Sequence, residues 1–212
     1  MNVYEAIAAR RTIRDFAPRR IARDTLFRIL GAGLQAPTHD HLRQWKFILV
    51  EDTKQREALV NFFRAGHTES ELEAMLDGWN MTVESQRDMY LDAIPKQARM
   101  IRDAGALVIP CFHQPSPILE KKTSLHELNA FASMWAVVEN ILIAAAGEGI
   151  HGVTKVVSTP DETAHIRQAL HMPNDYEVPC YLALGYPACD CPSLNQVPIA
   201  PRDRIFVGRW SA

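Results

Sequence analysis

The sequence predicts an α+β fold, in which helices and short strands share a single chain. Apolar residues recur at helical spacing over residues 3–10 and 23–35, which indicates two helices at the start. A long apolar segment begins after the capping-box pair Ser124 and Glu127 and ends near Ala146, which predicts a buried helix. Short apolar runs predict strands at 46–51, 106–112, 151–157 and 179–186.

Two more helices are expected between these strands. Residues 53–65 have a helical pattern directly after the first strand. Later in the chain, Thr159, Pro160 and Glu162 supply the N-cap, the first-turn proline and the N3 acid of a helix that ends at Leu170. In the strand at 106–112, Pro110 is expected to weaken the end because proline cannot donate to a sheet.

The length of 212 residues predicts one domain over 1–212, with a helical excursion at about 66–103. Thr68 and Glu71 form a capping box for a short acidic helix there, and a further helical pattern is broken near Pro95. Since this acidic, methionine-rich segment has no counterpart elsewhere in the chain, it is a candidate flap over a cleft.

The C-terminal segment 187–212 is expected to be an extended tail. It is rich in proline and has no helical period. Phe206, Val207 and Trp210 near its end are costly to leave in water. We therefore expect the tail to wrap around something, and a second subunit is the natural choice.

Composition excludes several classes of protein. A hydrophobic fraction of 47% and a charged fraction of 23% are those of a globular protein, and a net charge of -2 gives no attraction to nucleic acid or an anionic membrane. The start lacks the features of a signal peptide, and the apolar stretch 131–146 is too short for a membrane span because Glu139 and Asn140 interrupt it. Four cysteines in this length do not suggest a disulfide scaffold, so the expected location is the cytoplasm.

Charge is nevertheless uneven along the chain, with seven arginines in residues 1–28. The run Arg10-Arg11-Thr12-Ile13-Arg14 lies where the first helix gives way to extended chain. Guanidinium groups match phosphate oxygens, and a neighbouring hydroxyl adds a donor. An isolated run of this kind is more often a solvated helix end that favours the helix dipole.

Other motifs are weaker. Residues 147–152 match the letters G-x-G-x-x-G, but a helix precedes them and a strand follows, the reverse of a dinucleotide-binding turn. Residues 31–36 are a second apparent match, but they lie inside a helical pattern and so also lack the strand-turn-helix order of a dinucleotide-binding turn. Cys189-Asp190-Cys191 and His39-Asp40-His41 lack a second ligand pair, so no metal site is expected.

The order and spacing of several motifs resemble the nitroreductase family over nearly the whole chain, and most closely a short-form subgroup. Thr38 and Gln44 stand where that subgroup has an acid and a proline, and Val156 and Val157 replace small residues. The motifs that carry the resemblance are Arg10-Arg11-Thr12-Ile13-Arg14, Ala36-Pro37-Thr38, Gln44-Trp45-Lys46-Phe47, Glu139-Asn140-Ile141-Leu142-Ile143-Ala144-Ala145, Gly149-Ile150 and Leu182-Ala183-Leu184-Gly185-Tyr186-Pro187.

The resemblance implies a central, mostly antiparallel sheet flanked by helices, with the extended C-terminal tail exchanged between the subunits of a homodimer. FMN would lie between the subunits, with its phosphate at the N-terminal arginines and the tail arginines. The loop after the second helix would come from the other subunit, and Lys155 would lie at the flavin edge. The implied cofactor-binding residues are Arg10, Arg11, Thr12, Arg14, Pro37, Thr38, His39, His41, Arg43, Lys155, Arg202 and Arg204.

The implied activity is that of a ping-pong oxidoreductase without a catalytic side chain. FMN takes hydride from NADH or NADPH and passes it to a small electron-poor acceptor such as a nitroaromatic or a quinone. Two alternatives remain on the same fold: a flavin-dependent dehydrogenase of another metabolite, suggested by the altered edge at 155–157, and a non-enzymatic FMN-binding protein. The same motifs are also compatible with an α+β domain that binds no cofactor.

Overall fold

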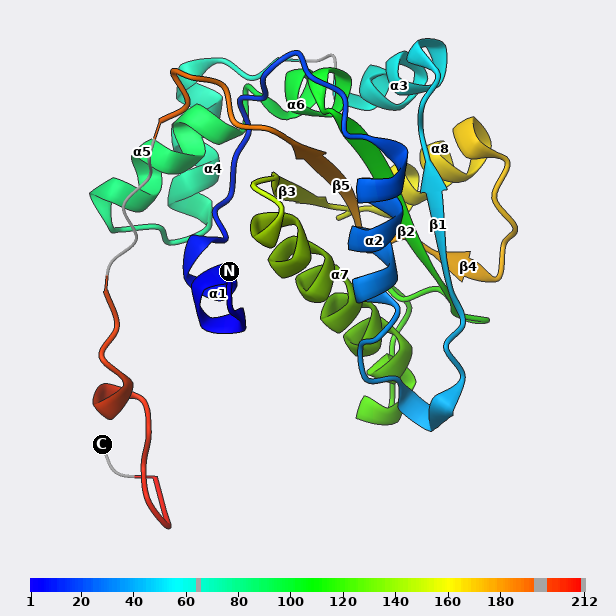
Figure 1. The fold of residues 1–212 in the computed structure, drawn as a ribbon, viewed down its shortest axis with the longest axis vertical. Coiled ribbons are helices and arrows are strands. Elements are labelled where there is room, and N and C mark those ends of the chain that lie inside the picture. The colour runs from blue at the N-terminus through cyan, green and yellow to red at the C-terminus, as the bar shows by residue number, and fades with distance from the viewer. Residues whose placement is uncertain (64–65, 193–197, 211–212) are drawn as a thin grey trace.

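The computed structural model describes residues 1–63, 66–192 and 198–210. In this part of the chain one antiparallel sheet forms the centre of the molecule (Figure 1). The α+β prediction and its four main strands are confirmed. The strand order is β1 (Trp45–Leu49), β2 (Ala106–His113), β5 (Cys180–Gly185) and β3 (His151–Val156), and β4 (Tyr176–Glu177) pairs with the end of β2.

Strand β2 continues through Pro110 instead of ending there. Leu107 O accepts from Val50 N, and His113 N donates to Gln44 O, so the odd-numbered residues of β2 bond toward β1. The ring nitrogen of Pro110 therefore points to the other side. There β5 pairs only as far as Val108 and β4 begins at Phe112, so the missing donor costs no ladder bond.

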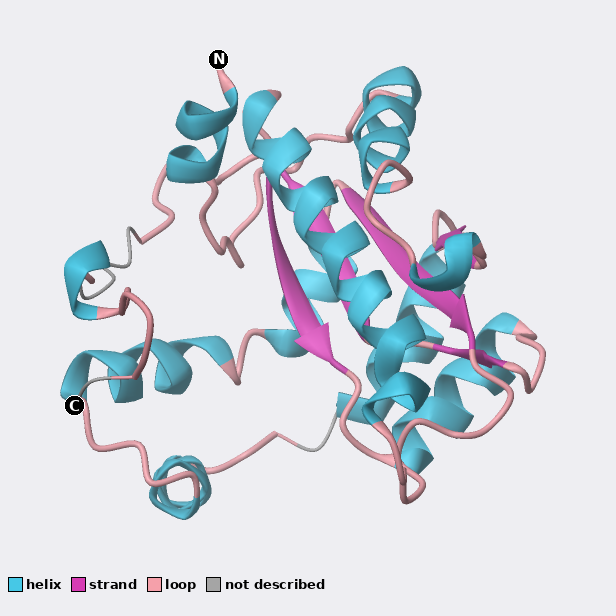
Figure 2. Cartoon of the chain, turned by 90° about the horizontal axis from the view of Figure 1, so that it is seen from below, coloured by secondary structure: helices cyan, strands magenta, loops and turns pink. Residues whose placement is uncertain are grey.

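Helices cover both faces of the sheet, and Figure 2 shows the longest one lying along the strands. Leu182 and Leu184 of β5 belong to one core cluster, and Tyr181 and Ala183 belong to the other, as strand alternation requires. The first face packs against α2 (Arg23–Gly33) and α7 (Asn129–Gly147). The second packs against α3 (Thr53–Val60), the turn η2 (Asn61–Phe63), α6 (Gln97–Asp103) and α8 (Pro160–Leu170).

The long helix begins as predicted, with the Ser124 and Glu127 capping box opening a 3-10 turn, η3 (Leu125–Leu128), that runs into α7. Together they span 23 residues, and this helix is long and apolar enough to cross a membrane by length and composition alone. Its inner face, which includes Met134 and Ile141, is fully buried in the core. The apolar stretch 131–146 was expected to be too short for a membrane span, but the helix that contains it is longer, because it also includes residues on both sides of the stretch.

The excursion contains α4 (Glu69–Gly78) and α5 (Glu84–Ala93), which lie outside the two layers (Figure 1). The predicted Thr68 and Glu71 capping box opens α4. Arg87 of α5 forms ion pairs with two acids of α4, which joins the helices to each other. Whether this pair of helices acts as a flap stays a prediction.

The described residues of the tail, up to 192 and from 198 to 210, are extended as expected, apart from one 3-10 turn, η4 (Pro201–Asp203). It leaves the body of the molecule in Figure 1. Val207 is 94% exposed and Trp210 is 83% exposed in the single chain. Exposure of such large apolar side chains is costly, which agrees with the prediction of a wrapping tail, although the exchange between subunits stays a prediction.

Candidate functional site

The N-terminal arginine run lies beside the first residues of β3. Helix α1 (Val3–Ala9) ends at Arg10, and the following chain turns along the sheet. Thr12 forms a parallel bridge with Gly152, and Ile13 N donates to Gly152 O at 3.3 Å. A Cβ at residue 152 would lie 2.9 Å from Ala183 O, so this close approach requires glycine. The backbone therefore holds the run in one place.

The same segment is fastened a second time farther along. Phe16 bridges Pro187, and Ala17 N donates to Tyr186 O at 2.8 Å. Asp15 pairs with Lys96 at 2.7 Å and with Arg99, and its backbone oxygen accepts from Ala188 N. These contacts pair the acid that follows Arg14 in the sequence with other cations.

The arginines of the run differ in how many hydrogen bonds and ion pairs they form. Arg11 donates to Ala8 O and Arg10 O, which satisfies carbonyls at the end of α1. Arg10 lies 3.9 Å from Glu139 of α7, which makes a loose ion pair. Arg14 has no hydrogen bond or ion pair with any described residue, and burial lowers its pKa against the opposing influence of Asp92. A half-buried, unoccupied guanidinium fits an anionic ligand.

His151 is a residue of this neighbourhood that the sequence did not single out. Its Nδ1 is buried and has no hydrogen-bond partner among the described residues. Burial lowers the His151 pKa, and the positive charges of Arg11 and Arg10 lower it further. Nothing in the sequence marks it, because a lone histidine at the start of a strand is ordinary.

The loop after α2 is anchored on the first half of α7. His39 N donates to Ser133 Oγ at 3.1 Å, and Thr38 Oγ1 accepts from Arg43 N at 3.2 Å. The 3-10 turn η1 (His39–His41) and its neighbour hold three non-glycine residues with positive φ, namely Asp40, His41 and Arg43. Such backbone strain costs of order 1–3 kcal/mol per residue and clusters at functional sites.

The loop and the arginine run lie against different parts of α7 in one chain. Ser133 anchors the loop near the beginning of the helix, whereas Glu139 is the neighbour of Arg10. Figure 1 shows the loop by the start of α7 and α1 beside its later turns. One chain alone therefore does not bring the two parts of the expected site together.

The tail arginines are also apart from the N-terminal ones in the single chain. Arg202 is 90% exposed, and its nearest acid is Asp203 at 3.9 Å. The tail leads away from α1 in Figure 1.

Lys155 occupies a different environment from the other expected residues. Its ammonium pairs with Glu162 on the face of the sheet covered by α8, and lies 4.8 Å from the ring centroid of Phe63. In the single chain this ammonium is paired and largely enclosed, which favours a structural role, and its place at the flavin edge stays a prediction.

Sequence and structure comparisons place the chain among known proteins. A model of the nitroreductase family matches residues 7–186. The chain belongs to the nitroreductase family. A Methanothermobacter thermautotrophicus protein, provisionally named NADH dehydrogenase/NAD(P)H nitroreductase, is 24% identical over 99% of this chain and 88% of its own length.

Solved structures of nitroreductase relatives show the same fold. The NADPH:FMN oxidoreductase of Vibrio harveyi, complexed with NAD+, superposes with a TM-score of 0.69 at 18% identity, over 100% of this chain and 79% of that one. An iodotyrosine deiodinase bound to FMN and 3-iodo-L-tyrosine gives a TM-score of 0.66 at 18% identity, over 99% of this chain and 100% of that one. The resemblance inferred from the motifs, and the nitroreductase-like fold, are therefore confirmed.

The weaker motifs have ordinary places in this nitroreductase-family chain. Residues 147–152 join the end of α7 to β3, in the order expected from the sequence. All four cysteines are free, and Cys111 and Cys180 are buried. Within residues 1–63, 66–192 and 198–210 there is no cluster of three or more His, Cys, Asp or Glu side chains that could hold a metal.

Proposed function

We propose that this protein is an FMN-dependent oxidoreductase that takes hydride from NADH or NADPH and reduces a small electron-poor acceptor, such as a nitroaromatic or a quinone. The observation that carries the proposal is the arginine run fixed at the edge of β3, with the guanidinium of Arg14 unpaired among the described residues. Each charge-assisted hydrogen bond to a phosphate contributes about 1.5–3 kcal/mol. Several such bonds together supply roughly 8 kcal/mol, which is the binding free energy of a micromolar complex.

The residues present fit a mononucleotide phosphate. Arg14 offers free donors, Arg10 is weakly paired, and the exposed Thr12 adds a hydroxyl. In the proposed dimer the tail arginines Arg202 and Arg204 join this group. The partner subunit's loop residues complete the site from the other side: Pro37, Thr38, His39, His41 and Arg43.

Three features of the single chain favour a homodimer. Only 33% of an apolar 18-residue stretch of the long helix that ends with α7 is buried, although the helix is apolar on nearly all sides. Tyr4 of α1 and Phe27 of α2 are exposed on two helices that both contact α7, and the tail exposes Trp210. A second copy that covers these surfaces also supplies the loop that one chain holds away from its own arginine run.

FMN, when bound, supplies the hydride chemistry, accepting two electrons from a nicotinamide and donating them to the acceptor. The protein binds and orients the phosphate through the arginine run, and the rigid loop on α7 provides a preformed wall. Apolar surface from α7 excludes water from the space between the subunits. Positive charge near the site favours electron-rich, reduced species.

Flavin-dependent dehydrogenation of another metabolite is the second candidate. Val156 at the end of β3 is 49% exposed, and a branched side chain there narrows the room beside the sheet edge. This bulk favours a small or flat substrate. A strict dehydrogenase turns over its metabolite without pyridine nucleotide, which separates the two functions.

The test is spectroscopic. Protein purified from flavin-replete cells should be yellow, and anaerobic NADH or NADPH should bleach it. Adding 4-nitrobenzoate, a benzoquinone or 3-iodo-L-tyrosine in turn should then restore the colour for those that are acceptors. Colourless protein that takes up no added FMN contradicts cofactor binding, whereas yellow protein that no nicotinamide bleaches contradicts the reductase and leaves the dehydrogenase or the non-enzymatic FMN protein.

A further inference from the structure

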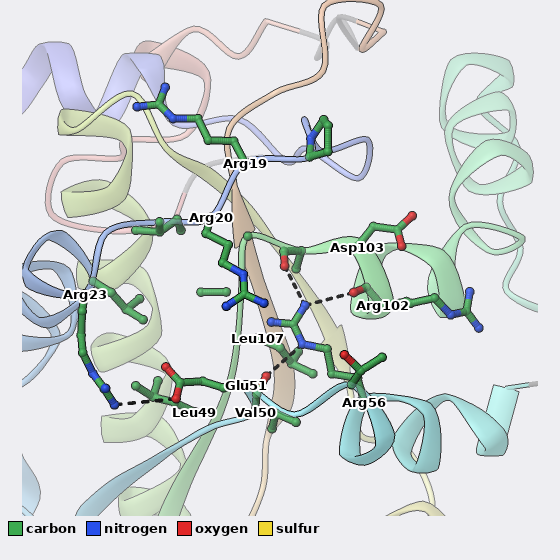
Figure 3. Close-up of a pocket in the computed structure, with 17 residues that line it drawn as sticks. Arg19, Arg20, Arg23, Leu49, Val50, Glu51, Arg56, Arg102, Asp103 and Leu107 are labelled. Atoms are coloured by element: carbon green, nitrogen blue, oxygen red, sulfur yellow. Dashed lines mark hydrogen bonds and ion pairs between the residues drawn. The ribbon is translucent and has the colours of Figure 1, made fainter.

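A pocket lies on the side of the molecule where β1 ends and β2 begins (Figure 3). Its volume is about 390 Å³, within the usual range for small-molecule sites. Its walls are the segment 18–23, the start of α3 and the end of α6. None of its lining residues belongs to the proposed flavin site.

Arg56 forms a fixed positive wall of this pocket. Its Nε donates to Val50 O at 2.9 Å, and one terminal nitrogen donates to Arg102 O at 3.0 Å and to Ala104 O at 2.7 Å. These bonds tie the guanidinium to the C-terminal carbonyls of α6 and hold it half-buried. Three backbone contacts therefore position the cation before any ligand arrives.

Arg20 faces Arg56 across the pocket. In Figure 3 the two guanidinium groups point toward one another. Arg20 has no hydrogen bond or ion pair with any described residue, and its charge is the second cause, after burial, that lowers the Arg56 pKa. Two like charges held face to face repel, and an anion between them would turn that repulsion into two attractions.

The acids around the pocket do not fill this role. Glu51 lies 3.7 Å from Arg23, and Asp103 points away from the space between the two guanidiniums in Figure 3. Arg102 is paired with Glu57 outside the pocket. Asp103 and Glu51 each influence Arg56 less than Arg20 does, so the acids of the lining offset the positive charge of the two arginines only in part.

Apolar side chains and one helix end shape the rest of the pocket. Ile21, Leu26 and Leu49 line it beside the arginines. Helix α2 begins at Arg23 after Ala22, which has no side-chain cap, so its first N–H groups add positive character on the same side. A ligand suited to this lining carries one oxyanion and a compact apolar body.

We propose that this pocket binds a small organic anion, with its carboxylate or phosphate between Arg20 and Arg56 and its apolar part against Leu26 and Leu49. The inference does not depend on flavin binding. It assigns the chain a second ligand site, on a part of the surface separate from the proposed redox site.

Calorimetric titration of the purified full-length protein with hexanoate, inorganic phosphate and uncharged hexanol, at constant ionic strength, tests the proposal. Hexanoate should bind more tightly than either of the other two. Arg20→Gln should weaken hexanoate binding by about tenfold or more, since a charge-assisted bond is lost. Arg28→Gln, which removes the same charge from an exposed position on α2, should leave it unchanged.

Two further variants separate the possible results. Arg14→Ala should leave hexanoate binding intact, and a loss there would mean that the anion occupies the N-terminal arginine run instead. Arg20→Gln should not lower the melting temperature of the parent, because Arg20 has no partner to lose among the described residues and its repulsion of Arg56 is relieved. No hexanoate binding, equal binding by Arg20→Gln and the parent, or equal losses in Arg20→Gln and Arg28→Gln would each overturn the pocket.

Discussion

The ammonium of Lys155 lies 2.5 Å from Oε1 of Glu162, a carboxylate whose side chain is only 1% exposed. Glu162 Oε2 also accepts from Ser158 N at 3.1 Å, and Glu162 N donates to Thr159 Oγ1. The pair thus joins β3 to the first turn of α8. This contact favours a structural role for a lysine that the sequence resemblance assigns to the flavin edge.

Breaking that pair from either side should destabilise the protein. Glu162→Gln or Lys155→Met leaves one buried charge without its partner, which typically costs about 3–5 kcal/mol of unfolding free energy. The double variant should recover part of the loss, because no unpaired charge remains. Urea unfolding of all four proteins measures this.

Flavin content provides the control for Lys155. If the lysine is structural, the FMN bound per folded chain stays the same in Lys155→Met as in the parent. Normal stability combined with lost flavin would return Lys155 to the cofactor site.

Arg14→Ala should weaken FMN binding about 10- to 100-fold, which corresponds to the loss of a bond of about 1.5–3 kcal/mol. Arg204→Ala should have a similar effect if the tail arginine reaches the same phosphate. Arg28→Ala, on the exposed side of α2, is the matched control and should bind FMN like the parent. Flavin fluorescence during titration of the apoprotein gives the affinities, and unchanged values for both Arg14→Ala and Arg204→Ala would remove the phosphate assignment.

His151 should report the charge of the same site. In the apoprotein its pKa lies below the usual value near 6.5, because burial and then Arg11 and Arg10 disfavour the imidazolium. The folded state therefore binds the proton less readily than the unfolded state. The resulting stability is present above pH 6.5 and is lost as the pH falls below it.

Nuclear magnetic resonance of the imidazole gives that pKa directly. Addition of FMN should raise it, since a phosphate dianion near Arg10 and Arg11 offsets their charge. His151→Asn should abolish the corresponding acid-side loss of stability. An apoprotein pKa at or above 6.5 would contradict the lowering by burial and the two arginines. A pKa that FMN does not change would place the phosphate elsewhere.

Local signals in the sequence predicted much of the fold. The capping boxes at Thr68 and Ser124 each involve residues three apart, so the helix starts could be predicted without tertiary information. Arg20 and Arg56 meet only because distant segments fold together. The same is true of His151 and Arg11, and no local pattern contains such pairs.

Two glycines of α2 offer a matched test of its packing against α7. A Cβ at Gly33 would lie 2.6 Å from Ile141 Cγ1, whereas nothing lies within 4 Å of a Cβ at Gly31. Gly33→Ala should therefore destabilise the protein by about 1–3 kcal/mol through overpacking. Gly31→Ala should stabilise it by about 0.5–1 kcal/mol through helix propensity. Thermal unfolding measures both, and equal effects would mean that the two helices are not in close contact at Gly33.

The tail should determine the oligomeric state. Phe206 and Trp210 contact each other at 4.9 Å between ring centroids, yet Trp210 is 83% exposed in one chain. Aromatic anchors of this kind contribute strongly to interfaces, so replacing both with alanine should weaken the dimer about 10- to 100-fold. Trp79→Ala, which removes a half-exposed tryptophan at the end of α4, is the control and should not change association. Sedimentation velocity over a range of concentrations measures the dissociation constants.

Because the partner's loop is needed to complete the proposed site, the tail variant should lose flavin as it dissociates. A monomeric parent that retains FMN would contradict both the exchange of the tail and the shared site.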